Sequence, residues 1–409
     1  MKIFKSKLNG KIKLCPSKSY THRQLIASML SKNETIVSNV DMSDDIKATL
    51  SCIKSYVRDF TIENDKVIFK KTDGIKNKLK EKNNICFNAN ESGSTLRFFF
   101  PLALQKFQNA TFFGSSKLIE RGINIYEQIL PNINVVKEEK KIIAIGSINP
   151  GNFNIQGNIS SQYITGLLYT LPLLQNDSEI NIVGDLESKN YILMTLDVLN
   201  KSNIQIDIGN QNIYDKNAVL TNFKIKKMQE YDTKDAIIEA DYSNAAFIDA
   251  FNYFDNNIVL DGLKEDSIQG DKIYKEYFEI LNKKYETIDI SNCIDLGPVL
   301  MAFATLKNGV HITGSRRLKL KESDRANAMA CELKKFGAKV CVEENDIYRE
   351  KTNLHSQNEM LLSHNDHRIV MSLSLFSNLF DIEIEGEKAI NKSYPSFFSD
   401  LMKIGLKTS

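Results

Sequence analysis

The chain has 409 residues, of which 42% are hydrophobic and 25% are charged, a balance typical of a globular protein of more than one domain and unlike a disordered or collagen-like chain. Its net charge of +2 gives no large basic field for nucleic acid, and its longest apolar runs fall far short of the roughly 20 residues that span a membrane. Six scattered cysteines without a C-x-x-C pair indicate reduced thiols, and no signal peptide is recognisable. We therefore expect a cytoplasmic enzyme, not a nucleic-acid-binding, membrane or disulfide-rich protein.

Six short strand-like segments recur along the chain, and each follows an apolar helix candidate by a short stretch. Alternation of apolar and polar residues predicts the strands, and a helical apolar period predicts the helices. The predicted helices are Thr21–Leu30, Thr95–Leu104, Tyr163–Leu174, Ala245–Phe254, Gly297–Leu306 and Arg368–Phe376. The predicted strands are Thr35–Asn39, Thr111–Gly114, Ile180–Gly184, Ile258–Gly262, Val310–Gly314 and Ile382–Gly386.

These segments define a repeated unit of helix, strand, polar loop and second helix, with further strands between units. The ends of the strands are spaced almost evenly along the chain, except that the interval from Gly262 to Gly314 is clearly shorter than the others. Six units divide naturally into two domains of three, with a crossing expected in the polar stretch Lys226–Glu239. The alternation of strands and helices predicts an α/β or α+β fold.

Polar and charged residues cluster at the N-terminal ends of the predicted helices, as in Ser17-Lys18-Ser19 and Asp366-His367-Arg368. Helix capping explains most of the Ser, Thr and Asp residues there. Helix N-termini also attract anions through their free N–H groups and their dipole, and Arg and Lys residues fall beside these ends. The pattern therefore predicts binding of phosphate and carboxylate groups.

Arginine is rare, with nine residues among the 53 basic side chains. Because the guanidinium group binds carboxylate or phosphate in a bidentate fashion that Lys cannot reproduce, the arginines are candidates for anion recognition. Arg58 and Arg349 are the exceptions, and we expect them to form surface ion pairs.

The segment Pro16-Ser-Lys18-Ser19-x-x-x-Arg23 resembles the N-terminal signature of the 5-enolpyruvylshikimate-3-phosphate synthase family. About ten further matches occur in the order that the family has, and together they extend to residue 395. They are Glu91-Ser-Gly93-Ser-Thr-Leu-Arg97, Glu120-Arg121, Ser160-Ser161-Gln162, Gly184-Asp-Leu-Glu-Ser188-Lys-Asn-Tyr191, Glu239-Ala-Asp241-Tyr-Ser, Gln269-Gly-Asp271, Asp295, Leu320-Lys321-Glu322-Ser-Asp324-Arg325, Asp366-His367-Arg368 and Lys392-Ser-Tyr-Pro395. Glu91, Gly122, Ile294 and Arg317 depart from residues that are common in the family.

The resemblance implies two similar domains, each of three β-α-β-α-β-β units with buried helices, and an active site in the cleft between them. The expected N-terminal domain, residues 15–238, lies on the shikimate 3-phosphate side. The expected C-terminal domain, residues 1–14 with 239–409, completes the phosphoenolpyruvate site. The chain should cross near Leu14–Ser17 and near Ile237–Ala240.

The reaction that the resemblance implies transfers the enolpyruvyl group of phosphoenolpyruvate to the 5-hydroxyl of shikimate 3-phosphate and releases phosphate. It requires no metal and no organic cofactor, and the five histidines show no H-x-x-x-H or Cys/His spacing for metal binding. The expected partners are these two small molecules, with no nucleic acid and no membrane, and we expect a monomer.

Three residues carry the chemistry in this interpretation, since proton transfer is needed at the hydroxyl and at the methylene carbon. Asp295 is expected to take the proton of the 5-hydroxyl. Glu322 and Lys18 are expected to deliver and remove the proton at the methylene carbon, and the division between them stays open because coupled groups share their titration.

Substrate-binding residues follow from the resemblance position by position. Those expected at shikimate 3-phosphate are Lys18, Ser19, Arg23, Ser160, Ser161, Gln162, Ser188, Tyr191, Asp295 and Lys321. Those expected at phosphoenolpyruvate are Lys18, Gly93, Arg121, Gln162, Arg325, Arg368 and Lys392. Arg97 and His367 are accessory candidates.

Three alternatives stay open at this point. A UDP-N-acetylglucosamine enolpyruvyl transferase resembles the chain, but normally carries a Cys in the loop that corresponds to Gly114–Arg121, which has none here. An RNA 3′-phosphate cyclase has a related repeat but needs a nucleotide and a nucleophilic His. A non-catalytic polyanion-binding module would explain the cations but not the pair of carboxylates Asp295 and Glu322.

Overall fold

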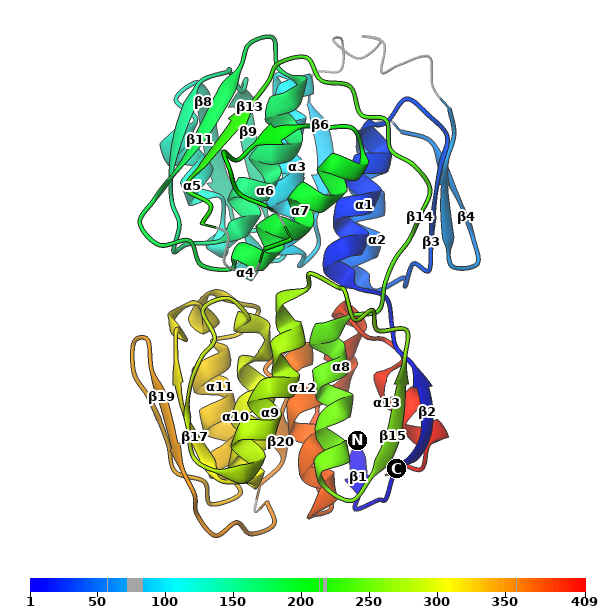
Figure 1. Ribbon diagram of the computed structural model, residues 1–409, viewed down its shortest axis with the longest axis vertical. Helices are drawn as coiled ribbons and strands as arrows, with labels where there is room; N and C mark the ends of the chain where they lie inside the picture. Colours follow the sequence, from blue (N-terminus) through cyan, green and yellow to red (C-terminus); the bar gives the residue numbers. More distant parts are fainter. Residues whose placement is uncertain (57, 72–83, 213, 216–218, 358) are drawn as a thin grey trace. The chain divides into compact units, whose positions relative to one another are not determined.

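The structure is a computed structural model that describes residues 1–56, 58–71, 84–212, 214–215, 219–357 and 359–409. The chain divides into two compact units, shown in Figure 1. We call Pro16–Ile238 the N-unit, and Met1–Cys15 together with Glu239–Ser409 the C-unit. The chain therefore passes from the C-unit to the N-unit after Cys15 and returns after Ile238.

The N-unit contains three apolar helices that are buried along nearly their whole length, namely α1, α3 and α6. Its helices are α1 (Lys18–Leu30), α2 (Asp44–Ser55), α3 (Gly93–Lys106), α4 (Ser116–Arg121), α5 (Asn124–Ile129), α6 (Ser161–Thr170), η1 (Leu171–Leu173, 3-10) and α7 (Lys189–Lys201). Its strands are β3 (Thr35–Ser38), β4 (Phe60–Glu63), β5 (Lys66–Phe69), β6 (Ile85–Asn88), β7 (Asn109–Phe113), β8 (Ile133–Glu138), β9 (Lys141–Gly146), β10 (Asn152–Gln156), β11 (Ser178–Val183), β12 (Ile206–Asp207), β13 (Asn222–Ile225) and β14 (Ala236–Ile237).

The C-unit repeats this plan around the buried helices α8, α10 and α12. Its helices are α8 (Tyr242–Asp249), α9 (Tyr274–Lys283), α10 (Gly297–Leu306), α11 (Arg325–Lys334), α12 (His367–Ser374) and α13 (Phe397–Lys403), and its 3-10 helices are η2 (Ala250–Tyr253), η3 (Gly270–Ile273), η4 (Ile294–Leu296), η5 (Arg316–Leu320), η6 (Leu375–Asn378) and η7 (Glu387–Lys392). Its strands are β1 (Lys2–Phe4), β2 (Asn9–Lys13), β15 (Asn257–Asp261), β16 (Thr287–Asp289), β17 (Gly309–Thr313), β18 (Val340–Val342), β19 (Ile347–Glu350), β20 (Leu361–Leu362), β21 (Ile382–Glu385) and β22 (Lys407–Thr408).

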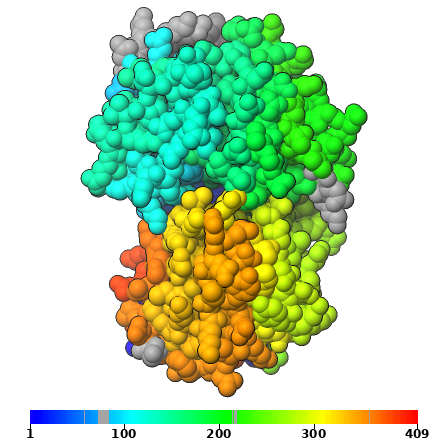
Figure 2. Space-filling view, turned by 90° about the vertical axis from the view of Figure 1, so that its left-hand side faces the viewer, coloured from blue at the N-terminus to red at the C-terminus, as the bar shows by residue number. Residues whose placement is uncertain are grey.

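Each sheet of the described chain contains one of the six predicted strands, now β3, β7, β11, β15, β17 and β21. In the four-stranded sheets this strand pairs in parallel with one neighbour and antiparallel with the next, as β7 does with β6 and β9. The sheet of β17 and β19 lies at the surface of the C-unit and is coloured yellow to orange in Figure 2. The predicted mixed α/β class, the repeat and the six strand and helix positions are confirmed.

The short interval between Gly262 and Gly314 has a structural cause in the fourth repeat. The sheet of that repeat contains only β15 and β2, which run parallel. In this fully described stretch α9 leads directly to β16, whereas α11 is followed by the hairpin of β18 and β19 before β20. The fourth repeat thus lacks the antiparallel hairpin that the fifth repeat has.

The buried helices of the N-unit pack closely because of a small residue at their crossing. A Cβ atom on Gly166 of α6 would lie 2.5 Å from the carbonyl oxygen of Arg97 on α3 and closer still to the hydroxyl of Tyr126. That hydroxyl donates hydrogen bonds to the carbonyl oxygens of Arg97 and Tyr163. Gly166 therefore sets the separation of the two helices whose N-terminal ends carry Gly93 and Gln162.

The expectation that Arg58 and Arg349 form surface ion pairs is wrong, because both side chains are buried. Arg58 Nη2 donates to the carbonyl oxygen of Asn33 at 2.9 Å. Arg349 donates through Nε and Nη2 to the hydroxyl and carbonyl oxygens of Thr305, in the last turn of α10. A cation at the C-terminal end of a helix satisfies carbonyls that lack a partner within the helix and interacts favourably with the helix dipole.

Candidate active site

Polar side chains cap five of the six buried helices at the ends where the sequence places the anion site. Ser17, Ser92 and Ser160 accept hydrogen bonds from backbone N–H groups in the first turns of α1, α3 and α6. Asp241 and Asp366 do the same for α8 and α12. The sixth helix, α10, continues instead from the 3-10 helix η4 with Pro298 in its first turn. Capping thus satisfies part of the N-terminus in five of these helices, and it does not account for the cationic side chains that lie beside them.

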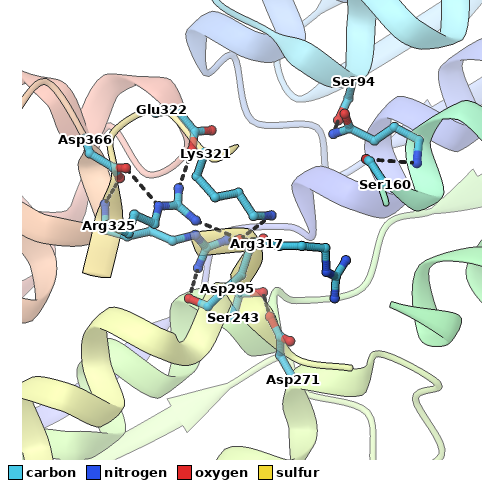
Figure 3. Close-up of polar contacts among 12 residues, drawn as sticks. Ser94, Ser160, Ser243, Asp271, Asp295, Arg317, Lys321, Glu322, Arg325 and Asp366 are labelled. Atoms are coloured by element: carbon cyan, nitrogen blue, oxygen red, sulfur yellow. Dashed lines mark hydrogen bonds and ion pairs between the residues drawn. The ribbon is translucent and has the colours of Figure 1, made fainter. Parts of the chain in front are cut away.

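Asp295, in η4 just before α10, is held by three cationic side chains of the C-unit (Figure 3). Its Oδ1 lies 2.8 Å from Arg325 Nη1 and 3.1 Å from Lys321 Nζ. Its Oδ2 lies 3.1 Å from Arg368 Nη2. Burial opposes ionisation, but the three cations hold the pKa of Asp295 well below its usual value. Asp295 is therefore a carboxylate in this arrangement.

Arg325 connects three carboxylates at the start of α11 and is only 1% exposed. Besides Asp295, its Nη2 lies 2.5 Å from Glu322 Oε2 and its Nε lies 2.8 Å from Asp366 Oδ2. Burial disfavours its charge, but the three carboxylates outweigh this and raise the pKa of Arg325 above its usual value. The arginine thus brings together Asp295 and Glu322, the two carboxylates that the sequence predicts to act in proton transfer.

Lys321 and Arg368 complete the group around Asp295. Burial lowers the pKa of Lys321, an effect that Asp295 partly opposes. Arg368 lies in the first turn of α12, where its N–H is capped by Asp366 at 3.0 Å and its Nη1 donates to the carbonyl oxygen of Asp295 at 3.3 Å. Its neighbour His367 is buried, with Nδ1 3.9 Å from Asp366 Oδ1.

Lys392, at the end of η7, is half-buried and donates through Nζ to the carbonyl oxygen of Asn365 at 2.5 Å. Asn365 directly precedes Asp366, the cap of α12. The structure thus places Lys392 against the segment that leads to Arg368.

Gly93 opens α3 and lies against three side chains of the N-unit. A Cβ atom built on it would lie 2.9 Å from Arg97 Nη1, 3.3 Å from Arg121 Nη2 and 3.5 Å from Gln162 Oε1. Arg97 Nη1 donates to Gln162 Oε1 at 2.6 Å, and Gln162 Nε2 donates at 3.0 Å to Oγ of Ser94, which is labelled in Figure 3. The structure therefore brings Gly93, Arg121 and Gln162 together and adds Arg97 as their support.

Lys18 and Arg23, both on α1, have different surroundings. Lys18 Nζ forms an ion pair with Asp45 Oδ2 at 2.8 Å, and both side chains are half-buried. Arg23 is buried and donates to Thr195 Oγ1, to the carbonyl oxygen of Ser19 and to that of Tyr191 at 2.8 to 2.9 Å. Burial lowers the pKa of Arg23. Arg23 thus ties α1 to α7 and fixes the backbone at Ser19 and Tyr191.

The remaining predicted residues of the N-unit lie at the starts of α6 and α7. Ser160 caps α6 and Ser161 is its buried first residue. Ser188 precedes α7 with φ of 56°, a left-handed conformation that is rare for a residue other than Gly and Asn. Tyr191 lies in the first turn of α7, with its ring 5.9 Å from the Cζ atom of Arg23. Residues held in such sparsely populated backbone conformations cluster at active sites and ligand-binding sites.

Three carboxylates have roles here that the sequence does not predict. Asp366 lies within the recognised Asp-His-Arg motif, but only the structure shows that it binds Arg325 and caps α12. Nothing in the sequence marks Asp45 as the partner of Lys18, because acidic residues are ordinary in the first turn of a helix such as α2. Asp271, from the Gln-Gly-Asp match, is buried and contacts the hydroxyl of Ser243 (Figure 3).

The electrostatics of Asp271 differ from those of Asp295. Burial, and next the negative charge of Asp295, raise the pKa of Asp271 to about 7. Two neighbouring carboxylates with opposite shifts are a frequent feature of sites that handle protons.

Among the described residues, no group of three or more His, Cys, Asp and Glu side chains is arranged to hold a metal ion. In the same part of the chain, no helix is long and apolar enough to cross a membrane.

Comparison with known proteins identifies relatives over nearly the whole chain. A family model described as EPSP synthase (3-phosphoshikimate 1-carboxyvinyltransferase) matches residues 4–401. The chain is 36% identical to the 3-phosphoshikimate 1-carboxyvinyltransferase of Clostridium novyi, over 99% of this chain and 97% of that protein. It is 38% identical to the enzyme of the same name from Clostridium perfringens, over 98% and 97%. Among solved structures, an EPSP synthase from Acinetobacter baumannii superimposes with a TM-score of 0.76 at 17% identity, covering 100% of this chain and 99% of that one.

Proposed function

We propose that this chain, which belongs to the EPSP synthase family, transfers the enolpyruvyl group of phosphoenolpyruvate to the 5-hydroxyl of shikimate 3-phosphate and releases phosphate. It is a transferase of the shikimate pathway, which leads to chorismate and the aromatic amino acids, and glyphosate inhibition is a property of its family. The observation that carries the proposal is Asp295, a carboxylate held by three cations, with Glu322 bound to one of them.

Phosphoenolpyruvate carries a phosphate and a carboxylate, and the proposal assigns its binding to Lys18, Gly93, Arg121, Gln162, Arg325, Arg368 and Lys392. Buried guanidinium groups such as those of Arg325 and Arg368 are suited to both anionic groups, because two parallel N–H donors match two oxygens. The close surroundings of Gly93 support its place in this set, since a side chain there would displace Arg97 and Arg121. Arg97 and His367 support neighbouring residues in this proposal.

Shikimate 3-phosphate is assigned to Lys18, Ser19, Arg23, Ser160, Ser161, Gln162, Ser188, Tyr191, Asp295 and Lys321. The contacts of Arg23 indicate a more specific role for this residue. Because its donors bind the backbone at Ser19 and Tyr191, Arg23 orients these two residues for the ligand.

Asp295 accepts the proton of the 5-hydroxyl in the proposed reaction, while Glu322 and Lys18 deliver and remove the proton at the methylene carbon. In the absence of ligand, three cations depress the basicity of Asp295. A bound phosphate and carboxylate compete for Arg325 and Arg368, which weakens their hold on Asp295 and raises its pKa toward the range useful for a base. Binding of phosphoenolpyruvate thus prepares Asp295 to act as a base on shikimate 3-phosphate.

The same competition applies to the other ion pairs. Lys18 is paired with Asp45, and Arg325 with Glu322, at distances of 2.8 and 2.5 Å. These carboxylates keep the cations neutralised until anionic substrates arrive, and exchange of partners releases Glu322 for proton transfer.

We further propose a monomer that acts in the cytoplasm. All six cysteines are free thiols in the structure, which supports a reducing compartment. The proposed domains are residues 15–238, which supply most shikimate 3-phosphate contacts, and residues 1–14 with 239–409, which complete the phosphoenolpyruvate site.

Release of inorganic phosphate tests the function directly. The purified chain is mixed with both substrates, with each substrate alone, and with phosphoenolpyruvate and UDP-N-acetylglucosamine. We expect phosphate only in the first mixture, and the same rate after incubation with fosfomycin, which alkylates the loop cysteine of the related transferase. Phosphate release with the nucleotide sugar, or inactivation with a mass adduct on a cysteine, would favour the other enolpyruvyl transferase.

A further inference from the structure

Glu332 lies in the last turn of α11 with a carboxylate that is completely buried. Its Oε2 accepts hydrogen bonds from the backbone N–H of Leu362 at 2.9 Å and from Lys335 Nζ at 2.8 Å. Its Oε1 accepts one from His364 Nε2 at 2.7 Å. A buried charge is tolerated only when it is paired and hydrogen-bonded, and each of these partners meets that need.

Two of these partners belong to the short segment from Leu361 to Asp366, which joins β20 to α12. In this segment His364 and Asn365 have φ values of 50° and 53°. Two consecutive left-handed residues other than Gly cost free energy and persist only where the surroundings fix them. The bonds from Glu332 to Leu362 and His364 supply that constraint.

The other end of the segment is bound to the other end of the same helix. Asp366 Oδ2 lies 2.8 Å from Arg325 Nε and accepts from Ser323 Oγ at 3.0 Å. Arg325 and Glu332 are two helical turns apart on α11, hence on one face, separated by about 10 Å along the helix axis. One face of α11 thus binds the segment at both ends, through Glu332 and Arg325.

The segment in turn positions cations assigned to phosphoenolpyruvate. Asp366 binds Arg325 and caps the N–H of Arg368, and the carbonyl oxygen of Asn365 accepts from Lys392 Nζ. Tilting the segment would move the partners of all three cations together.

Resting on the function proposed above, we infer that Glu332 is a positioning residue for the phosphoenolpyruvate site. Through Leu362 and His364 it fixes the segment that holds Arg325, Arg368 and Lys392 in place. Glu332 itself contacts no substrate in this account. Its loss weakens binding of phosphoenolpyruvate by shifting Arg325, Arg368 and Lys392.

Two substitutions of His364 separate the hydrogen bond from the backbone conformation. His364→Gln retains an N–H donor at the position of Nε2, but tolerates the left-handed backbone poorly. His364→Asn suits that backbone, because Asn adopts it readily, but its amide is too short to reach Glu332. His364 is partly exposed, so both variants are expected to fold.

We expect His364→Asn to raise the KM for phosphoenolpyruvate roughly tenfold, the effect of one lost buried hydrogen bond, with little change in the KM for shikimate 3-phosphate. His364→Gln should stay near the wild-type value. Glu332→Gln, which removes the charge at the centre of the cluster, should act like His364→Asn or more strongly. Its kcat should change less than its KM for phosphoenolpyruvate, because a positioning residue takes no part in proton transfer.

Asp346→Asn is the matched control. Asp346 Oδ1 lies 2.8 Å from Nε2 of His311, and the two residues form another histidine–carboxylate pair of the C-unit, with His311 on β17 and Asp346 directly before β19. This pair lies outside the set of proposed site residues, and both KM values should remain those of the wild type.

The outcomes distinguish the inference from the function on which it rests. A wild-type chain that releases no phosphate from the two substrates contradicts the proposed function. If the wild type is active, one result of the His364 variants overturns the inference. In that result His364→Asn has the wild-type KM for phosphoenolpyruvate while His364→Gln has a raised one, because backbone strain then decides the effect. Equal rises of both KM values in Glu332→Gln, with unaltered unfolding, would also overturn it.

Discussion

Asp295 shows how strongly single residues of this chain depend on their neighbours. A buried carboxylate would ordinarily gain a proton, but Arg368, Lys321 and Arg325 keep it ionised. Asp271, also buried, has Asp295 among its neighbours and retains its proton to about pH 7. The same residue type thus serves as a charged acceptor in one position and as a neutral hydrogen-bonding group in the other.

The first prediction at this scale concerns the proposed proton-transfer groups. Asp295→Asn and Glu322→Gln each keep the size of the side chain and remove its basicity, so kcat should fall by about two to four orders of magnitude, the usual contribution of general acid–base catalysis. Steady-state phosphate release measures the effect. The exposed Glu343→Gln serves as the control and should keep wild-type kcat. Near-native turnover in either site variant would refute its assigned role.

A second prediction concerns Gly93. In Gly93→Ala the new methyl group would lie 2.9 Å from Arg97 Nη1 and 3.3 Å from Arg121 Nη2, so both guanidinium groups must move. We expect the KM for phosphoenolpyruvate to rise more than the KM for shikimate 3-phosphate.

Gly151→Ala is the control for this prediction, since a Cβ atom there has no neighbour within 4 Å. Both variants are compared in the same phosphate assay. Identical KM values for Gly93→Ala and the wild type would show that Gly93 is only a turn residue.

The sequence supplies candidate site residues, but it does not predict the partners that hold them. Lys18, Arg325 and Arg368 are recognisable because their motifs stand in the order of a known family. The pairing of Lys18 with Asp45 and of Arg325 with Asp366 is not recognisable, because an ion pair between distant parts of the chain depends on how separate helices pack. Arg349 is an error of a different kind. Its charge predicts an exposed side chain, but the side chain is buried and donates to a carbonyl oxygen at the end of α10.

At the scale of the elements, hydrogen bonds between side chains join the buried helices near their N-terminal ends. His22 on α1 lies 2.7 Å from Thr49 Oγ1 on α2, which lies 2.8 Å from Thr95 Oγ1 on α3. Thr95 in turn donates to Ser92, the cap of α3. Burial, with the nearby charges of Lys18 and Arg23, lowers the pKa of His22 well below its usual value, so its ring is neutral here.

This chain of hydrogen bonds gives a prediction about stability. Thr49→Val has nearly the same shape but removes the hydroxyl between His22 and Thr95, which leaves two buried polar groups without that partner. The free energy of unfolding should fall by about 1–3 kcal/mol. Urea denaturation measures it, with the exposed Thr61→Val on β4 as the control, for which we expect less than about 0.5 kcal/mol. Equal stability of the two variants would mean that the network contributes nothing.

Local patterns predict the repeated strands and helices, but not the strands that pair with them in parallel. The predicted helix Thr95–Leu104 becomes α3, which begins earlier, at Gly93, because Ser92 caps it. β6 and β20 are short, and each pairs in parallel with a strand on the far side of a helix, so only tertiary pairing identifies them as strands. The missing hairpin of the fourth repeat is visible in the sequence only as the short interval between Gly262 and Gly314.

At the scale of the whole molecule, stability depends on pH through the buried carboxylates. The first cause of the raised pKa of Asp271 is burial, and the charge of Asp295 comes next. The folded protein therefore keeps a proton on Asp271 up to about pH 7, whereas the unfolded chain loses it near pH 4. Between these values the folded state binds one proton more, so this group makes the protein less stable as the pH rises.

Asp271→Asn should remove that dependence, because Asn cannot ionise yet can still form a hydrogen bond with Ser243. Relative to the wild type, the denaturation midpoint of the variant should therefore rise as the pH increases from 5 to 8. The opposite sign would hold for a carboxylate with a lowered pKa such as Asp295, whose contribution is lost on acidification. Urea titrations at pH 5, 6.5 and 8 make the comparison, with Asp65→Asn in an exposed turn as the control. A difference between Asp271→Asn and the wild type that stays constant over this range would show that Asp271 is ionised throughout, and that Ser243 and Arg368 outweigh its burial.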